Sequence, residues 1–130
     1  MEPPKGAKVV TTNVAKIWIT DENIVIRKSY PGSVTSLDNA VENVEATAKL
    51  SNHTRLPLLV DMRKIKGISG EARNYYTKAD NISALALWVD SPLSMLIGNF
   101  FIGLNKTIIP TKIFTKESNA MKWLKKFLEK

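Results

Sequence analysis

Two aspartates in the sequence follow short apolar runs of the kind that form buried strands. Asp61 lies at the end of the run 56–62, and Asp90 follows the run 82–89. Strand ends in open α/β sheets form the crevice where ligands bind, so the two carboxylates could hold a cation or share a proton. Nothing near them supplies the other groups of a catalytic site, and Asp often ends strands by accepting loop N–H bonds. We therefore expect both aspartates to terminate strands.

The only histidine, His53, lies in the polar segment 51–54, with no acidic or nucleophilic residue at a motif spacing. The chain has no cysteine, which excludes disulfides and thiolate chemistry. It also lacks a Gly-rich phosphate loop, a G-x-S-x-G nucleophile elbow and an H-E-x-x-H zinc motif. We therefore expect no enzymatic activity, no metal site and no cofactor.

Ser69 stands directly before Gly70 and Glu71, where a helix is expected to begin. A serine at this position caps the helix by accepting a backbone N–H bond, which contributes about 1 kcal/mol. A phosphate on the same hydroxyl would lie at a helix N-terminus and be favoured by the helix dipole. Ser69 is therefore a cap and, as a further hypothesis, a phosphorylation switch.

The segment 91–105 contains no charged residue, although Asp90 and Lys106 bracket it. Ser91 followed by Pro92 is typical of a helix start, and the helix is expected to reach about residue 104. The helical repeat predicts an inward stripe of large apolar residues: Leu93, Leu96, Ile97, Phe100, Phe101 and Leu104. Met95 and Ile102 fall on the opposite side, with Gly98 and Asn99 between. Either another part of the domain covers this side, or it is a contact surface.

Hydrophobic periodicity and turn signals predict the elements that position these residues. Two β-rich runs flank the polar turn 21–23, which predicts a hairpin. Further strands are expected over 56–62, 82–89 and 111–114, and helices over 37–50, after Gly70, over 92–104 and at the C-terminus. The order ββαβαβαβα predicts an α/β fold with a mixed, mostly parallel five-stranded sheet and four helices. Residues 1–14 are expected to be a flexible arm, and residues 15–130 a single domain.

The helix over 37–50 is the clearest amphipathic segment. Thr35 or Ser36 is its expected N-cap. The i, i+4, i+7, i+11 spacing predicts one inward face made of small and branched apolar residues: Leu37, Ala40, Val41, Val44 and Ala48.

The element order over nearly the whole chain resembles the SpoIIAA-like fold of STAS domains, the anti-sigma-factor antagonist type. The local match is the apolar strand ending in Asp61, followed by the loop 65–70 that leads through Ser69 and Gly70 into a helix. The C-terminal half, 91–124, is similar to bacterial SpoIIAA-like proteins without assigned function.

The resemblance implies two roles for the domain. In phosphorylatable family members the loop reads close to Asp-Ser-Ser-Gly, and Ser69 matches the target serine; Gly67 and Ile68 stand where the family has Asp and Ser. Related folds also bind apolar small molecules or lipids, so the resemblance implies an apolar ligand as an alternative to a protein partner.

The net charge of +7 is the strongest compositional hint of a nucleic-acid partner. The aromatic residues, however, fall at core-like spacing and do not interleave with the lysines as stacking platforms do. We therefore expect no nucleic-acid partner. No apolar run approaches the roughly 20 residues that span a bilayer, and no apolar signal core follows the N-terminus. The expected location is the cytoplasm.

These observations favour a non-enzymatic, STAS-like interaction and regulatory module that acts by protein–protein contact and forms a homodimer. Its expected surfaces are the loop around Ser69, with Gly67, Ile68 and Gly70, and the outer side of the third helix, with Met95, Gly98, Asn99 and Ile102. The alternative is binding of an apolar small molecule, a lipid or a membrane surface through the helix 92–104.

Overall fold

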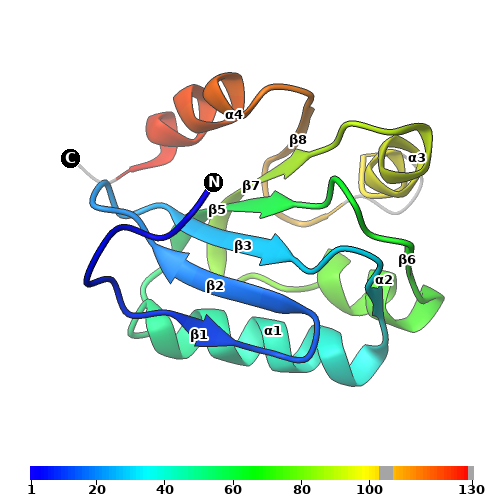
Figure 1. The fold of residues 1–130 in the computed structure, drawn as a ribbon, viewed down its shortest axis with the longest axis horizontal. Coiled ribbons are helices and arrows are strands. Elements are labelled where there is room, and N and C mark those ends of the chain that lie inside the picture. The colour runs from blue at the N-terminus through cyan, green and yellow to red at the C-terminus, as the bar shows by residue number, and fades with distance from the viewer. Residues whose placement is uncertain (103–106, 129–130) are drawn as a thin grey trace.

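The computed structural model, which describes residues 1–102 and 107–128, is built on a six-stranded mixed sheet (Figure 1). Its strand order is β1-β2-β3-β5-β7-β8. The strands are β1 (Val10–Thr11), β2 (Ala15–Ile19), β3 (Val25–Ser29), β5 (Leu56–Asp61), β7 (Ile82–Trp88) and β8 (Thr111–Phe114). β1, β2 and β3 pair antiparallel, whereas β3, β5, β7 and β8 pair parallel. The predicted hairpin is β2–β3, and Asn23 in its turn adopts a positive φ of 66°.

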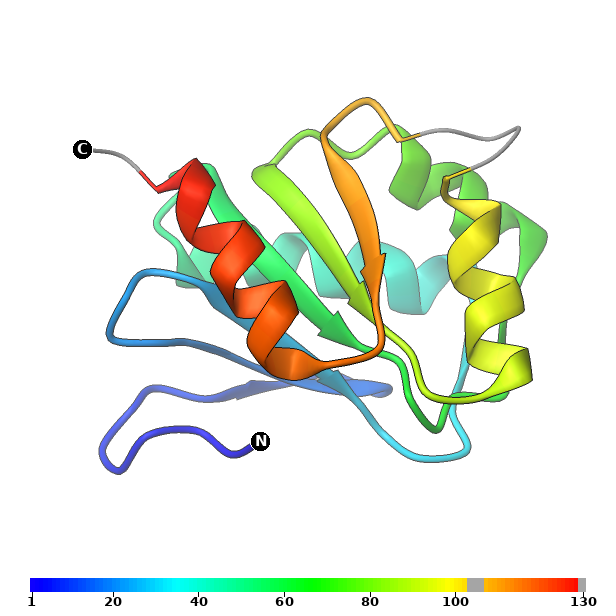
Figure 2. The same cartoon turned by 90° about the horizontal axis from the view of Figure 1, so that it is seen from above.

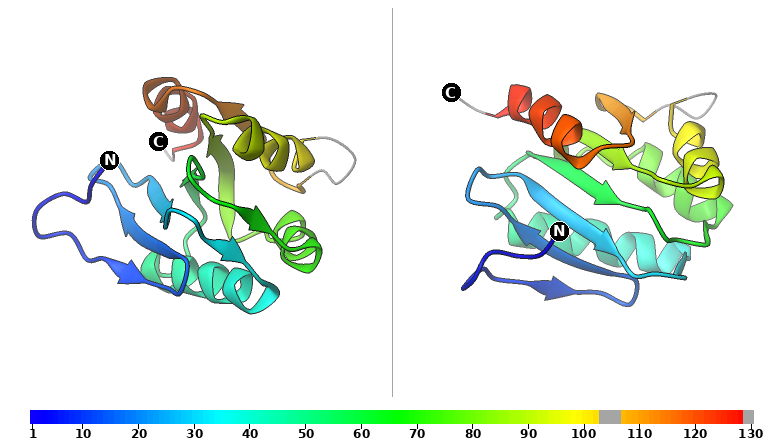
Figure 3. Two further views of the ribbon diagram at one scale, coloured as in Figure 1. Left: turned by 45° about the vertical axis from the view of Figure 1, so that its right-hand side comes forward. Right: turned by 45° about the horizontal axis from the view of Figure 1, so that its top comes forward.

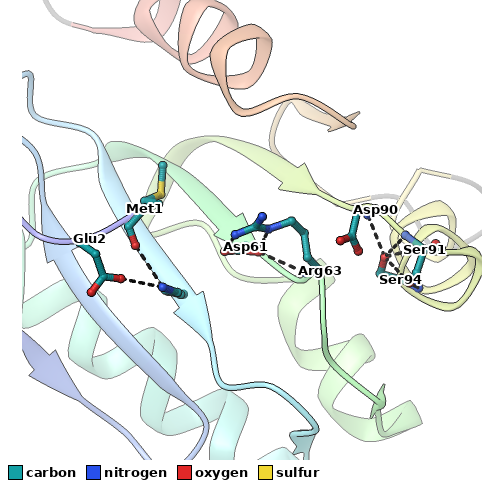
Figure 4. Close-up of polar contacts among 8 residues, drawn as sticks. Met1, Glu2, Asp61, Arg63, Asp90, Ser91 and Ser94 are labelled. Carbon is teal, nitrogen blue, oxygen red and sulfur yellow. Dashed lines mark hydrogen bonds and ion pairs between the residues drawn. The ribbon is translucent and has the colours of Figure 1, made fainter.

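The α/β class, the mostly parallel sheet and the four helices are confirmed, but the sheet has six strands and not five. The additional strand, β1, lies in the segment expected to be a flexible arm. The N-terminus is also tied to β3, because Nζ of Lys28 donates to the Met1 carbonyl at 3.1 Å and to Glu2 at 2.7 Å (Figure 4). A second, two-stranded sheet pairs β4 (Val34–Thr35) with β6 (Gly67–Ile68). Strands of two residues are too short to show any periodicity in the sequence.

The helices cover both faces of the sheet. α1 (Leu37–Leu50) and α2 (Gly70–Thr77) lie against one face, and α4 (Glu117–Leu124), which continues into the 3-10 turn η1 (Lys125–Phe127), lies across the other (Figures 1 and 2). α3 (Pro92–Phe100) packs beside α2 and against β6 and β8 (Figure 3). Two cores result, one beneath α1–α3 and one around Trp18, Trp88 and Leu124 beneath α4. No helix in the described ranges is both long and apolar enough to cross a membrane.

α1 begins at its predicted N-cap, Ser36, but presents a different face to the sheet. Its buried residues are Ala40, Asn43 and Thr47, while the four residues expected inward beside Ala40 are only half-buried: Leu37, Val41, Val44 and Ala48. The reason lies in β3, where Arg27 points toward the helix. Its guanidinium donates to Oγ1 of Thr47 at 2.9 Å, so polar residues of α1 turn inward to meet it.

α3 also differs from the prediction. The helix ends at Phe100 with Phe101 as C-cap, and its buried residues are Ser94, Ile97 and Gly98, followed by Phe101. Leu93 and Leu96, expected inward, are 45% and 69% exposed, and Leu104 lies outside the described residues. Ser94 turns inward because its hydroxyl accepts the N–H groups of Asp90 and Ser91, both at 3.2 Å.

Candidate functional site

Ser69 lies between β6 and α2 and serves as the N-cap of α2. Its Oγ accepts the N–H of Ala72 at 3.1 Å, and its own N–H donates to the Thr35 carbonyl at 2.9 Å. The predicted capping role is thus confirmed, and the side chain is half-buried. Phosphorylation of Ser69 stays a prediction.

Two of the residues predicted to form an interaction surface with Ser69 already pair with another strand of the domain. Gly67 and Ile68 form β6, paired with Val34 and Thr35 of β4, and both are half-buried. Gly70 is exposed at the first turn of α2. What this loop offers to a partner is therefore the edge formed by β4, β6 and the start of α2.

The two aspartates at strand ends do not form a joint site. Asp61 is 4% exposed and accepts a bidentate ion pair from Arg63, with Nε–Oδ1 at 2.9 Å and Nη2–Oδ2 at 3.0 Å (Figure 4). The Arg63 guanidinium also stacks over Trp88 at 3.7 Å, and the hydrogen bonds with Asp61 raise its pKa above the usual range. Asp90 is exposed. β5 ends at Asp61, whose Oδ1 accepts the Arg63 N–H at 3.2 Å, so this aspartate terminates its strand as expected. β7 ends at Trp88, two residues before Asp90.

His53 likewise has a structural explanation. It follows α1 in a left-handed conformation with φ of 60°, donates its N–H to the Ala48 carbonyl at 2.7 Å, and is exposed. Across residues 1–102 and 107–128, no group of three or more His, Asp or Glu residues could hold a metal ion.

The outer side of α3 carries the largest concentration of exposed apolar side chains. Met95 and Ile102 are 40% and 39% exposed, as the helical repeat predicted, and Asn99 is exposed beside them. Leu93 and Leu96 join them on this side. We call these four apolar residues the α3 patch: Leu93, Met95, Leu96 and Ile102.

The placement of Gly98 on this outer surface was wrong. Gly98 is buried, and a Cβ built on it would lie 3.3 Å from Cδ1 of Ile113 and 3.5 Å from Cγ1 of Val89. The absence of a side chain lets α3 approach β8 closely. The small residue therefore serves packing inside the domain and does not lower the outer surface.

A buried polar cluster that the sequence did not reveal surrounds Arg27 of β3. Arg27 is 5% exposed, and its Nη2 donates to Thr47 and, at 3.3 Å, to the Asn43 carbonyl. The Asn43 side chain accepts from Thr12 at 2.7 Å and donates to the Tyr76 hydroxyl at 2.9 Å. Four elements, the segment before β2, β3, α1 and α2, thus meet at one polar centre.

Arg27 keeps a cation in the core without a carboxylate to balance it. Burial lowers the pKa of Arg27, and the electrostatic influence of Tyr76 partly opposes this shift. The Tyr76 ring lies 5.6 Å from the guanidinium carbon. Nε of Arg27 is buried and has no hydrogen-bond partner among the described residues. The sequence does contain a signal for this site. Arg27 ends an apolar run, and strand alternation places it on the same face as Val25, which is expected to point into the core.

A cavity adjoins this polar cluster beneath α1 and α2. Its volume is about 60 Å³. Arg27, Asn43 and Tyr76 contribute to its wall, which is otherwise mainly apolar. It is lined from β5 and β7 by Leu58, Val60, Leu85 and Leu87, and on the α3 side by Phe101.

The comparisons place this fold in a known group. Residues 17–128 match the model of a family described as a domain of unknown function, DUF7793. The chain belongs to the DUF7793 family. No curated protein shows significant similarity to it.

Solved structures show what the DUF7793 fold is similar to. An uncharacterised protein from Shewanella loihica PV-4, of the DUF3478 family and with a SpoIIAA-like fold, matches over 95% of this chain and 98% of its own, with 14% identity and a TM-score of 0.52. This match confirms the SpoIIAA-like fold that the resemblance implied. A protein of unknown function from Arthrobacter sp. FB24 matches over 83% of this chain and 96% of its own, with 28% identity and a TM-score of 0.34.

In this DUF7793 domain the two predicted surfaces lie side by side. α3 packs against β6, the strand that leads to Ser69, and lies beside α2 (Figures 2 and 3). The Arg73 guanidinium of α2 lies 4.3 Å from the ring centre of Phe100 in α3. The loop at Ser69 and the α3 patch are therefore neighbouring parts of one end of the molecule, while the Arg27 cavity lies inside it.

Proposed function

We propose that this DUF7793 domain is a non-enzymatic, STAS-like interaction and regulatory module of the cytoplasm that acts by protein–protein contact and forms a homodimer through the α3 patch. The observation that carries the proposal is the exposure of the patch. Leu93, Met95, Leu96 and Ile102 are each at least 39% exposed. The first three lie on α3, which carries no charge, and Ile102 directly follows its C-cap. Such a patch marks an interaction site or creates a risk of aggregation.

A symmetric dimer is the simplest partner for this surface, because each copy supplies the same patch to the other. Asn99 lies among the apolar residues and offers an amide that can pair with its symmetry mate. Leu93, Met95 and Leu96 lie in the first half of α3, and Ile102 follows its C-cap, so two copies could pack with these surfaces against each other.

The regulatory part of the proposal rests on Ser69. A phosphate there would add close to two negative charges at the N-terminus of α2. Arg73 lies one turn further along α2, and a Cβ built on Gly70 would be 3.8 Å from its Nη2. Because α3 packs against β6 and Phe100 contacts Arg73, a phosphate that attracts Arg73 would disturb one edge of the proposed interface.

The test is the oligomeric state of a charged variant of the patch. Met95→Lys combined with Ile102→Glu places opposite charges on the outer side of α3. We expect the wild type to be a dimer in size-exclusion chromatography with light scattering, and the variant to be a monomer with unchanged helical circular dichroism. Ser118→Lys combined with Asn119→Glu is the matched control, because both residues are exposed on α4; this variant should stay dimeric.

Two results would refute self-association through α3. The wild type could remain monomeric at the highest concentration reached, or the charged variant could unfold, which would show that Met95 or Ile102 belongs to the core.

The uncharged helix also favours a second candidate, attachment to a membrane surface, because Leu96 in its middle is 69% exposed. A helix whose apolar side faces outward can lie in the bilayer interface. Flotation with anionic vesicles separates the two candidates. Membrane attachment predicts that the wild type floats and that Leu96→Ser does not, whereas a dimerisation surface predicts that neither floats.

A further inference from the structure

Arg27 is a buried cation for which no residue in the described part of the chain supplies a counter-charge. The ion pairs within residues 1–102 and 107–128 join Lys28 to Glu2, Arg63 to Asp61 and Lys125 to Glu22, and all three cations are at least 30% exposed. Arg27 is 5% exposed and belongs to none of these pairs. Burying an ionised group costs several kcal/mol unless it is paired and hydrogen-bonded.

The neutral partners of Arg27 satisfy it only in part. An arginine has five N–H donors and stays protonated in proteins, so it cannot escape the cost of burial by neutralising. The Thr47 hydroxyl and the Asn43 carbonyl both use Nη2, whereas the buried Nε has no partner. Arg63 shows the contrast, since that half-exposed guanidinium receives a bidentate carboxylate from Asp61. Arg63 thus has a carboxylate partner, whereas the buried Arg27 has none among the described residues.

The cavity beside Arg27 offers room for what is missing. Its volume of about 60 Å³ exceeds the roughly 10–15 Å³ that one water molecule requires. Its walls are mainly apolar side chains of β5, β7 and the α3 region, while Arg27, Asn43 and Tyr76 converge at one side. Apolar walls with a few converging polar groups are the usual composition of a small-molecule site.

We propose that this cavity binds a small monocarboxylate with an apolar chain, its carboxylate on Arg27 and its chain among Leu58, Leu85 and Phe101. A guanidinium and a carboxylate can form two parallel, charge-assisted N–H···O bonds, which makes this pair both strong and geometrically specific. Among the described residues, Arg27 is the one charged residue that lines the cavity. A single positive charge suits one negative charge and leaves the second charge of a phosphate unbalanced. The site goes beyond the proposed dimer, because it lies inside the domain and not on the α3 patch.

The experiment compares hexanoate with hexan-1-ol, which has the same chain without the charge. Both are titrated into ¹⁵N-labelled protein and followed by two-dimensional NMR, which gives the dissociation constant and the residues affected. We expect the wild type to bind hexanoate at least about tenfold more tightly than the alcohol, the effect of a hydrogen-bonded charge. The largest shifts should fall on Arg27, Tyr76 and Leu85.

Arg27→Met removes the charge and keeps a side chain of similar length, a change that is often neutral for stability at buried ion sites. This variant should bind both compounds equally. Arg63→Met is the matched control, because it removes a paired cation outside the cavity lining, and it should keep the preference for hexanoate.

Equal binding of acid and alcohol by the wild type, or no shifts with either compound, would overturn the proposal, as would an acid preference that survives Arg27→Met. If Arg27→Met does not fold, the wild-type comparison still decides. The charged variant of the α3 patch should bind hexanoate like the wild type, so a failed dimer and a failed ligand site give different results.

Discussion

Gly98→Leu tests most directly how α3 lies on the sheet. In the structure, a single Cβ at this position would already lie 3.3 Å from Ile113 and 3.5 Å from Val89. A leucine would add three further carbons beside these contacts, and Val89 is fully buried. Overpacking of this kind costs roughly 3 kcal/mol at its upper range, while replacing a helical glycine recovers about 1 kcal/mol. The net loss of folding free energy is therefore about 2 kcal/mol.

Urea denaturation followed by circular dichroism measures this loss as a lower midpoint at unchanged slope. Asn99→Leu is the matched control, since Asn99 is the next residue and is exposed. The free energy of unfolding of this variant should change by less than about 0.5 kcal/mol. Gly98→Ala should fall within about 1 kcal/mol of the wild type, because the end of the Ile113 side chain can shift by a few tenths of an ångström. If Gly98→Leu proves neutral or stabilising while Asn99→Leu destabilises, the helix presents the face expected from its sequence, and the orientation of α3 described above is wrong.

The remaining predictions concern Ser69, the N-terminus and catalysis. Ser69→Ala should cost about 1 kcal/mol of folding free energy in urea denaturation, because the Ala72 N–H loses its capping bond. Ser69→Asp should change partner binding in pull-downs more than it changes stability. Unaltered binding would refute the switch hypothesis. Lys28 lowers the pKa of Glu2 below its ordinary value of 4.5 through a hydrogen bond and its charge. The Lys28–Glu2 contact that holds the N-terminus should therefore be intact above pH 4.5 and be lost as the pH falls through the lowered pKa of Glu2. An NMR titration of the Glu2 carboxyl measures this pKa. A pKa at the ordinary value would contradict the prediction. A hydrolase and transferase screen should show no turnover, and an activity abolished by Asp61→Asn would refute the non-enzymatic proposal.

The elements with strong local signals could be predicted from the sequence. The β2–β3 hairpin, the long strands β5 and β7, and the helix starts at Ser36, Ser69 and Ser91 are all recognisable from periodicity and capping residues. The short strands β1, β4 and β6 were missed, because two residues carry no pattern and pair only through backbone groups of distant segments.

The faces that α1 and α3 present to the sheet could not be predicted, and the reason is the same in both helices. A hydrophobic stripe fixes the orientation of a helix only when the surface beneath it is uniformly apolar. Beneath α1 the sheet presents Arg27, which draws Thr47 inward, and beneath α3 it presents Ile113 and Val89, which leave room only for Gly98. In each case a residue of another element decided the orientation.

The candidate site at Arg27 follows from this dependence on distant partners. Strand alternation alone puts Arg27 on the same face as Val25, which is fully buried, so the sequence contains a conflict between a charged residue and a core position. The sequence cannot show how the conflict is resolved, because Asn43, Thr47 and Tyr76 meet the guanidinium only in the folded chain. A selection for stability alone would favour an apolar residue of the same size at this position. Arg27 instead stays buried beside a cavity, with its Nε lacking a hydrogen-bond partner among the described residues. The carboxylate of a bound ligand, as proposed above, would explain why a cation is kept at this position.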